Sequence, residues 1–287
     1  VMTSWAPNVN GRIRVVTASP DGSRIYIGGS FTQVNGQTRS RIAAFNTADG
    51  SLVANFKPTM GSDVFGIAAS NSLVYAGGWF TTVGGVARSR LAAMNASDGS
   101  LTAWAPVADF TVNALALTAD QTRVVVAGAF AQLNGEPATS IGSLSASDGT
   151  SYPFAANQVV HNTGNSASLM SLKVVDGKAY TSGFWFGGTG NFEGGLIVDP
   201  YDGTILNMAN CLGDTYDVTP MNGLMYMVSH HHQCTDIGGF PEEVPRIYQH
   251  TDAVTIEPTG LVQHNSYGYP DFYGNPSGSY VNWLPYM

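Results

Sequence analysis

The stretch RIYIGGSFTQVNGQTRSRIAAFNTADGSL, residues 24–52, decides the fold, because it returns almost without gaps as LVYAGGWFTTVGGVARSRLAAMNASDGSL at residues 73–101. Residues 123–150 follow the same template, and residues 178–205 and 224–261 keep its framework with less identity. Each copy closes on a glycine, and the successive spacings are 49, 50, 54 and 57 residues. These glycines are Gly50, Gly99, Gly149, Gly203 and Gly260. A period of this length indicates a repeat architecture.

Each copy is predicted to form four short strands. In the first copy, residues 15–18 and 24–27 flank the tetrapeptide Ser-Pro-Asp-Gly at 19–22, where Asp-Gly supplies the positive φ that a hairpin turn needs. Residues 41–46 give a third strand and residues 52–56 a fourth. No stretch shows a sustained 3.6-residue apolar period, so helices are not expected. Four short strands per repeat predict an all-β propeller with five evident four-stranded blades.

The predicted organisation is one propeller domain over residues 1–287. The blades are expected over residues 8–58, 59–106, 107–156, 157–209 and 210–287. An aromatic–proline motif precedes the repeats, as in Trp5-Ala6-Pro7, and returns at Trp283-Leu284-Pro285. If each copy of this motif along the chain is counted as an outer strand, the chain has six outer strands, whereas five blades need only five. This favours a fragment of a larger ring over an unusual ring closure.

Charge narrows the range of partners. The formal net charge of −8 argues against nucleic acid and against an anionic membrane surface. No apolar run approaches the roughly 20 residues of a membrane span, so membrane insertion is not expected. Residues 1–143 carry nine basic and seven acidic side chains, whereas residues 144–287 carry three basic and thirteen acidic ones. An ordinary solvated surface is the favoured interpretation, and a recognition surface for a cation or a hydroxyl-rich ligand is the alternative.

The repeat unit G-G-x-F-T-x-V-G/N-G-x-x-R-S-R-L/I-A-A followed by D-G-S-L resembles the repeat of secreted actinobacterial β-propeller proteins, which often carry PKD or lectin-like domains. The fifth repeat adds CLGDTYDV (residues 211–218), SHHHQC (229–234) and GGFP (238–241) to this resemblance. The resemblance covers essentially the whole chain. It implies secretion, a cell-surface or extracellular setting, and other domains of the parent chain as partners. It carries over no catalytic residue.

Two cysteines, Cys211 and Cys234, both lie in the fifth repeat. Their even number and the low-charge, glycine-rich composition favour an oxidising compartment and one disulfide between them. Free buried thiols and metal ligation are the alternatives.

The run His230-His231-His232 is the most chemically conspicuous feature. On a strand, His230 and His232 share one face, and two such imidazoles can chelate a transition metal together with Asp214 or Asp217. A polar strand end with hydrogen-bonded histidines is favoured, because four ligands at structural-zinc spacing are missing. Calcium at the recurring Asp-Gly turns is also disfavoured, since each turn offers a single carboxylate. No cofactor is therefore expected.

Residues 264–287 are rich in aromatic side chains among Asn, Ser, Gly and Asp. Aromatic faces with short polar side chains suit a glycan, and the same composition serves protein recognition. A loop that packs its own aromatics is an equally weighted alternative. The candidate ligand-binding residues are Tyr267, Tyr269, Tyr273, Tyr280 and Trp283.

The sequence thus favours an extracellular recognition or scaffold module that binds a glycan or a surface protein without catalysis. It holds no Gly-x-Ser-x-Gly elbow, no His-Glu-x-x-His motif and no phosphate-binding glycine loop. The rival is a secreted polysaccharide hydrolase or lyase with His230, His232, Asp214 or Asp217 as acid–base or metal groups. A structural spacer in a surface assembly is the third interpretation.

Overall fold

The computed structural model describes residues 5–235, 241–246 and 248–256. Regular structure in these residues is almost entirely β-strand, and the one helical element among them is the 3₁₀ turn η1 (Ala155–Gln158). The predicted all-β fold is confirmed.

Five antiparallel sheets follow one another along the chain. Sheet 1 contains β1 (Ile13–Ala18), β2 (Arg24–Gly29) and β5 (Ile42–Asn46), and sheet 2 contains β6 (Val64–Ala69), β7 (Leu73–Gly78) and β10 (Leu91–Asn95). Sheet 3 contains β11 (Val112–Leu117), β12 (Arg123–Gly128), β15 (Ile141–Ser145) and β16 (Ser151–Tyr152). Sheet 4 contains β17 (Ala167–Val175), β18 (Lys178–Trp185), β19 (Gly194–Val198) and β20 (Ile205–Asn210). Sheet 5 contains β21 (Thr215–Met221), β22 (Leu224–His231) and β23 (Gln249–Thr255).

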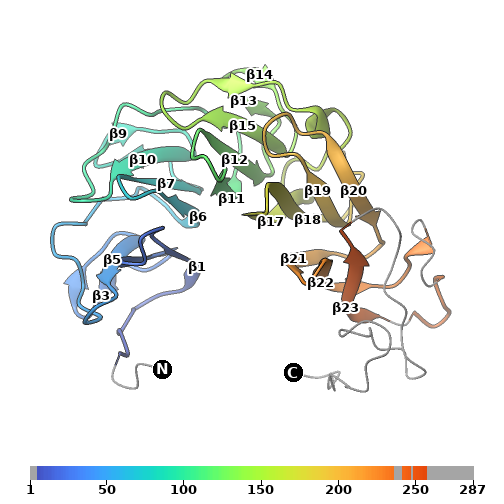
Figure 1. The fold of residues 1–287 in the computed structure, drawn as a ribbon, viewed down its shortest axis with the longest axis horizontal. Coiled ribbons are helices and arrows are strands. Elements are labelled where there is room, and N and C mark those ends of the chain that lie inside the picture. Colours follow the sequence, from blue (N-terminus) through green and yellow to red (C-terminus); the bar gives the residue numbers. More distant parts are fainter. Residues whose placement is uncertain (1–4, 236–240, 247, 257–287) are drawn as a thin grey trace.

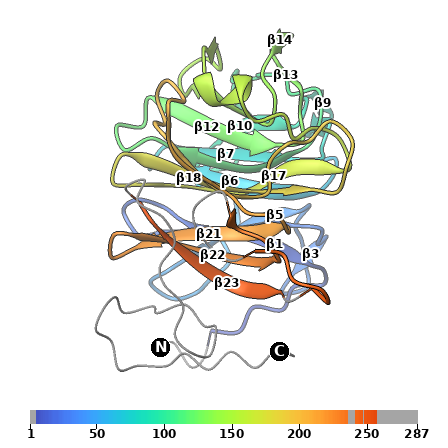
Figure 2. The ribbon, with the colours of Figure 1, turned by 90° about the vertical axis from the view of Figure 1, so that its right-hand side faces the viewer.

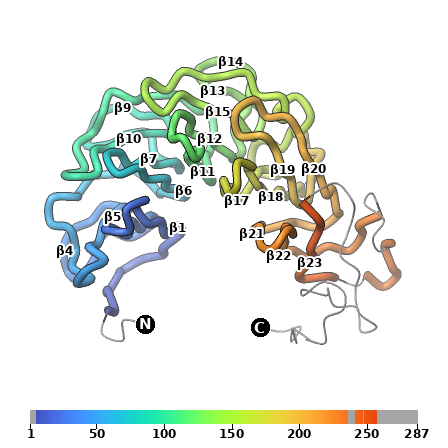
Figure 3. Tube along the Cα trace, viewed as in Figure 1, coloured from blue at the N-terminus to red at the C-terminus, as the bar shows by residue number. Residues whose placement is uncertain are grey.

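The sheets lie side by side along an arc, with the first strand of each on the inner side (Figure 1). Sheets 1 and 5 form the two ends of the arc, and in the view turned by 90° both lie below the other three sheets (Figure 2). The Cα trace follows the same path from sheet 1 around to sheet 5 (Figure 3). This radial succession of small meanders is the arrangement of propeller blades. The division of residues 1–287 into five blades of one domain, and its continuation into a larger ring, stay predictions.

The fourth strand is complete in two of the five sheets. In sheets 3 and 4 it is β16 and β20. In sheets 1 and 2 it is reduced to single bridges, Phe45 to Leu52 and Met94 to Leu101. The strand predicted over residues 52–56 is therefore a single contact at Leu52, after which the chain leaves the sheet.

The glycine pair at the end of the second strand lets the next sheet approach closely. A Cβ on Gly28 would lie 2.7 Å from Cγ1 of Val64 in sheet 2. A Cβ on Gly77 would lie 2.7 Å from Cγ1 of Val112 in sheet 3. Any larger residue would therefore separate neighbouring sheets, and the apolar core between them explains why this pair recurs.

A small hairpin joins the second and third strands of sheets 1 to 3, and the sequence analysis missed it. The hairpins are β3 (Gln33–Val34) with β4 (Gln37–Thr38), β8 (Thr82–Val83) with β9 (Val86–Ala87), and β13 (Gln132–Leu133) with β14 (Glu136–Pro137). Their turn pairs all have positive φ. The pairs are Asn35-Gly36, Gly84-Gly85 and Asn134-Gly135. Asn-Gly and Gly-Gly are the strongest short signals for such turns, so the sequence did contain the evidence.

The aromatic–proline motif forms an inter-repeat clasp, and neither Trp5 nor Trp104 lies in a strand. The count of six outer strands stays a prediction. Trp5 Nε1 donates to the carbonyl of Gly50, 2.9 Å away, in the closing turn of the repeat that follows it. Trp104 Nε1 donates in the same way to the carbonyl of Ser145, at 2.8 Å. Pro58 packs against the closing glycine of its following repeat, Gly99. Trp283-Leu284-Pro285 lies outside the described residues.

Candidate functional site

Side chains of sheets 4 and 5 line a cavity of about 600 Å³, here called the β18–β22 pocket. Its lining combines aromatic rings with carboxylate, imidazole and guanidinium groups. The lining residues are Trp185, Phe186, Glu193, Gly213, Asp214, His230, His232, Arg246, Tyr248 and His250. A volume of this size is typical of small-ligand sites.

Antiparallel geometry explains why these residues meet. The second strand ends at the edge where the first and third strands of the same sheet begin. Residues 186–193 join β18 to β19 there, and residues 232–248 join β22 to β23. These connections take the place of the hairpin-bearing connections of sheets 1 to 3. The one in sheet 4 is shorter than those, and the one in sheet 5 is longer. β18 contacts β21, and this packing of sheet 4 against sheet 5 brings the two connecting segments together.

The three histidines divide between the pocket and the sheet interior, as strand alternation requires. His230 and His232 line the pocket, whereas His231 is completely buried. His231 Nδ1 lies 2.6 Å from Oδ2 of Asp252, and its Nε2 lies 2.7 Å from Oγ1 of Thr215. His231 therefore joins all three strands of sheet 5 from inside.

Glu193 and Asp214 form the acidic wall of the pocket. Glu193 is 8% exposed, and its Oε2 accepts a hydrogen bond from the Gly213 N–H at 2.9 Å. Burial raises the pKa of the Glu193 carboxyl, and the negative charge of Asp214 raises it further. The hydrogen bond from Gly213 acts in the opposite direction and is the weaker effect. Asp214 Oδ2 lies 3.9 Å from Nε2 of His230, whose Nδ1 is hydrogen-bonded to the Tyr216 hydroxyl at 2.8 Å.

His232 and Arg246 also line the pocket, and both contact Glu242. His232 Nδ1 lies 3.5 Å from Oε1 of Glu242, and Arg246 Nε donates to the same oxygen. Burial, and then the charge of Arg246, lower the pKa of His232, so its imidazole is neutral at pH 7. The Tyr248 ring lies edge-on to His232, with ring centroids 6.0 Å apart. Because His232 Nδ1 is buried beside Glu242, Nε2 is the ring nitrogen that remains for a ligand.

The structure separates the four predicted metal ligands. His230, His232 and Asp214 line the pocket, but Asp217 faces Lys173, whose Nζ donates to both of its carboxylate oxygens at 2.6 and 2.7 Å. Within the described ranges, no group of three or more His, Cys, Asp or Glu residues is arranged to hold a metal ion. A metal site at these residues stays a prediction.

The predicted disulfide between Cys211 and Cys234 is present, and both residues are buried. It fixes the segment before β21 to the segment after β22, next to Gly213 and His232 of the pocket. The predicted ligand-binding residues lie outside the described part of the chain. They are Tyr267, Tyr269, Tyr273, Tyr280 and Trp283.

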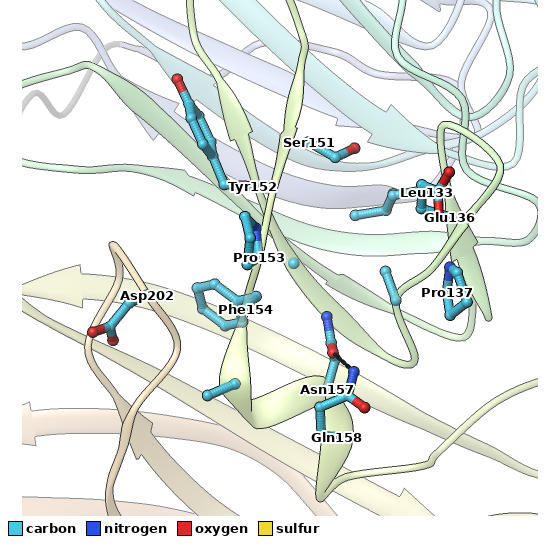
Figure 4. Close-up of a pocket in the computed structure, with 13 residues that line it drawn as sticks. Leu133, Glu136, Pro137, Ser151, Tyr152, Pro153, Phe154, Asn157, Gln158 and Asp202 are labelled. Atoms are coloured by element: carbon cyan, nitrogen blue, oxygen red, sulfur yellow. Dashed lines mark hydrogen bonds between the residues drawn. The ribbon is translucent and has the colours of Figure 1, made fainter.

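A second hollow of about 530 Å³ lies between the outer edge of sheet 3 and a turn of sheet 4 (Figure 4). Gln158 Nε2 donates to Oδ1 of Asn157 at 2.8 Å within it. Glu136 and Asp202 are its acidic residues, and no basic residue lines it. Asp202 caps its own turn by accepting the Thr204 N–H at 2.8 Å, and this bond lowers its pKa. The hollow thus offers fewer ligand-binding groups than the β18–β22 pocket, which is the candidate site.

No helix in the described ranges is both long enough and apolar enough to cross a membrane.

Comparison with known proteins supports the fold. A family model for a β-propeller domain of unknown function, DUF5122, matches residues 19–56, within the first repeat. A chain in a crystal structure of the mitotic checkpoint complex is similar with a TM-score of 0.54 at 12% identity, over 87% of this chain and 64% of that one. A chain of Kuenenia stuttgartiensis hydrazine synthase is similar with a TM-score of 0.53 at 8% identity, over 85% and 63%.

This chain therefore spans less than two thirds of the length of either of those chains. At such identities the likeness shows the β-propeller fold alone, which in general supports a binding or scaffold role. None of the curated proteins is a significant match.

Proposed function

We propose that this chain is an extracellular recognition module that binds a glycan in the β18–β22 pocket without turning it over. The observation that carries the proposal is the lining of the pocket, where Trp185, Phe186 and Tyr248 surround polar and charged groups. Phe186 is 83% exposed. Aromatic faces cover the C–H surfaces of a sugar ring, while imidazole, carboxylate and guanidinium groups bond to its hydroxyls.

The tyrosine-rich segment, residues 264–287, is the second surface in this proposal. Its candidate residues follow sheet 5 in the chain, which carries most of the pocket. A surface protein recognised through these aromatics is the competing partner. Secretion is supported by the disulfide, because disulfides persist in oxidising compartments.

A glycan array on the disulfide-intact protein, with and without EDTA, tests the proposal. We expect specific binding that survives EDTA. Phe186→Ala should weaken it at least tenfold, whereas Trp79→Ala should leave it unchanged. Trp79 is a matched control, because it is an exposed aromatic residue directly after β7, the strand of sheet 2 that corresponds to β18. Binding lost to Tyr267→Ala but not to Phe186→Ala would move the site to the tyrosine-rich segment.

Two other outcomes of the array would change the proposal. A blank array would rule out glycan recognition and leave a protein-facing scaffold. Binding that disappears in EDTA would make His230, His232 and Asp214 the first candidates for metal ligands.

A second candidate function is a secreted polysaccharide hydrolase or lyase. Glu193 favours it, because burial raises the pKa of one carboxyl beside a second carboxyl, Asp214, in the same pocket. Carboxyl groups in such different environments are typical of acid–base pairs in glycoside cleavage. Turnover of a bound glycan, abolished by Glu193→Gln with binding retained, would establish this function. Absence of products from every glycan that binds would exclude it.

A further inference from the structure

The β18–β22 pocket carries more negative than positive charge. Among its described lining residues, Arg246 is the one guanidinium and there is no lysine. The Arg246 Nε is already bonded to Glu242, which compensates its charge. Glu193 and Asp214 line the same pocket. Among the described residues, neither forms an ion pair with a lysine or an arginine. The pocket thus leaves room for a cation supplied by the ligand.

Aromatic rings line the same pocket as the two carboxyl groups. Trp185 ends β18, Phe186 follows it, and Glu193 directly precedes β19 at the other end of the same connection. Ammonium groups bind to the faces of aromatic rings, most strongly where water is partly excluded. Hydrogen bonds between ammonium and carboxylate are about twice as strong as neutral ones. Both interactions select the same chemical group, an amine.

We propose that the glycan taken by this pocket carries a free amino group, as in a hexosamine residue, held between Glu193, Asp214 and the aromatic rings of Trp185 and Phe186. This inference rests on the proposed function and names the class of its ligand. His232, through its Nε2, and the Tyr248 hydroxyl, which also interacts with Arg246, line the same pocket and can bond to the ring hydroxyls.

Size and chemistry favour an amino sugar over the side chain of a lysine. A cavity of about 600 Å³ is wider than one extended alkyl chain requires. His232 and Tyr248 add hydrogen-bonding groups to the lining, and a lysine stem offers these groups no partner. An alkyl stem beside them would displace water without replacing its hydrogen bonds, at a cost in binding free energy.

Calorimetric titration with oligomers of β-1,4-linked glucosamine and with their fully N-acetylated counterparts tests the inference. N-acetylation removes the charge but keeps the ring and its hydroxyls. We expect the free amine to bind at least tenfold more tightly at pH 6, with a preference that shrinks at high salt. Equal or tighter binding of the N-acetylated oligomer would overturn the inference while glycan recognition stands. Binding of neither oligomer, together with a blank array, would overturn both.

Two substitutions test the acidic wall. Asp214→Asn and Glu193→Gln should each reduce the preference for the amine at least fivefold while affinity for the N-acetylated oligomer stays within twofold. Glu136→Gln, in the second hollow, is the control and should change neither affinity. Since the preference is a ratio measured on one variant, a general loss of folded protein does not imitate it. If neither variant folds, the wild-type comparison of the two oligomers decides. Tighter binding of oligolysine than of glucosamine oligomers would assign the pocket to a basic peptide and overturn the inference.

Discussion

The imidazole of His231 lies 2.6 Å from the carboxylate of Asp252, and neither side chain has any exposed surface. With Thr215 on the other ring nitrogen, the pair connects β21, β22 and β23. Polar groups buried this deeply stabilise a fold only while they remain paired. The integrity of sheet 5, and of the pocket on its edge, therefore depends on this contact.

We expect His231→Ala to lower the free energy of unfolding by about 3–5 kcal/mol, because it removes the imidazole paired with the buried Asp252 carboxylate, while the Ser229 hydroxyl stays 3.3 Å from that carboxylate. Urea denaturation followed by tryptophan fluorescence measures the change. His230→Ala is the matched control, and we expect it to cost less than about 1 kcal/mol, because His230 lies in the pocket and is partly exposed. Equal effects of the two substitutions would contradict a structural role for the buried pair.

The clasp between repeats predicts different effects for two glycines of nearly equal φ. Gly99 has a φ of +74° and Gly36 a φ of +75°, so alanine costs the same backbone strain at either position. At Gly99 the new Cβ would lie 2.8 Å from Cδ of Pro58, whereas at Gly36 no atom lies within 4 Å. We expect Gly99→Ala to destabilise the protein by about 1–3 kcal/mol more than Gly36→Ala in urea denaturation. The absence of this excess would mean that Pro58 does not hold the turn.

Two turn aspartates predict acid sensitivity. The Ser19 hydroxyl, and then the Ser23 N–H, lower the pKa of Asp21 from 3.8 to about 2, and the Thr118 hydroxyl is the main cause of the same shift at Asp120. Because the folded state holds these protons less tightly than the unfolded state, the stabilisation is complete above about pH 4 and is lost as the pH falls to about 2.

The melting temperature should therefore decrease across this interval. Asp21→Asn together with Asp120→Asn should lower it at pH 6 and flatten the acid limb of the profile. A variant with two other exposed aspartates replaced, Asp109→Asn and Asp176→Asn, controls for net charge. An unchanged slope in the Asp21 and Asp120 variant would show that other groups cause the acid sensitivity.

Removal of the disulfide should affect stability and ligand binding together. The bridge joins residues 23 apart in sequence, so its loss should cost about 3–4 kcal/mol in the chain-entropy model. Cys211 is followed closely by Gly213 and Asp214, so a looser segment should also weaken binding in the pocket. Thermal melting and glycan titration of the double variant Cys211→Ala, Cys234→Ala measure both effects. A variant as stable as the wild type would contradict the first expectation, and full affinity would contradict the second.

The fold was predictable from the sequence because the same turn-forming residues recur at the same place in successive repeats. Asp49-Gly50 and its equivalents close each repeat, and in four repeats the aspartate accepts the N–H two residues on, as Asp49 does from Ser51 at 2.9 Å. Such local signals need no knowledge of distant residues. The outer strands were harder to predict, because β-propensity over residues 52–56 does not reveal that pairing in sheet 1 is limited to the bridge from Phe45 to Leu52.

The site was only half predictable, because it depends on contacts between residues that are distant in the sequence. The histidine run identified β22, but Glu193 and Phe186 come from another repeat and reach the pocket through the packing of sheet 4 against sheet 5. No spacing in the sequence relates them to His230. A signal did exist in the fourth repeat, where the Arg-Ser-Arg that follows the hairpin in the first two repeats is missing and residues 186–193 read FGGTGNFE.

The clasp also has a consequence for how new repeats can be added by gene duplication. Trp5 bonds to Gly50 in the closing turn of the repeat that follows it, Trp104 bonds to Ser145 where such a turn starts, and Pro58 packs on Gly99. In these three repeats, one half of a joint therefore lies at the start and the complementary half at the end. A duplicated gene segment of one repeat therefore encodes a unit that fits its own copy without new interface mutations. Divergence can then proceed in one unit while its neighbours hold it in place. The fourth and fifth repeats, which have lost most identity but line the pocket, are where such divergence has gone furthest.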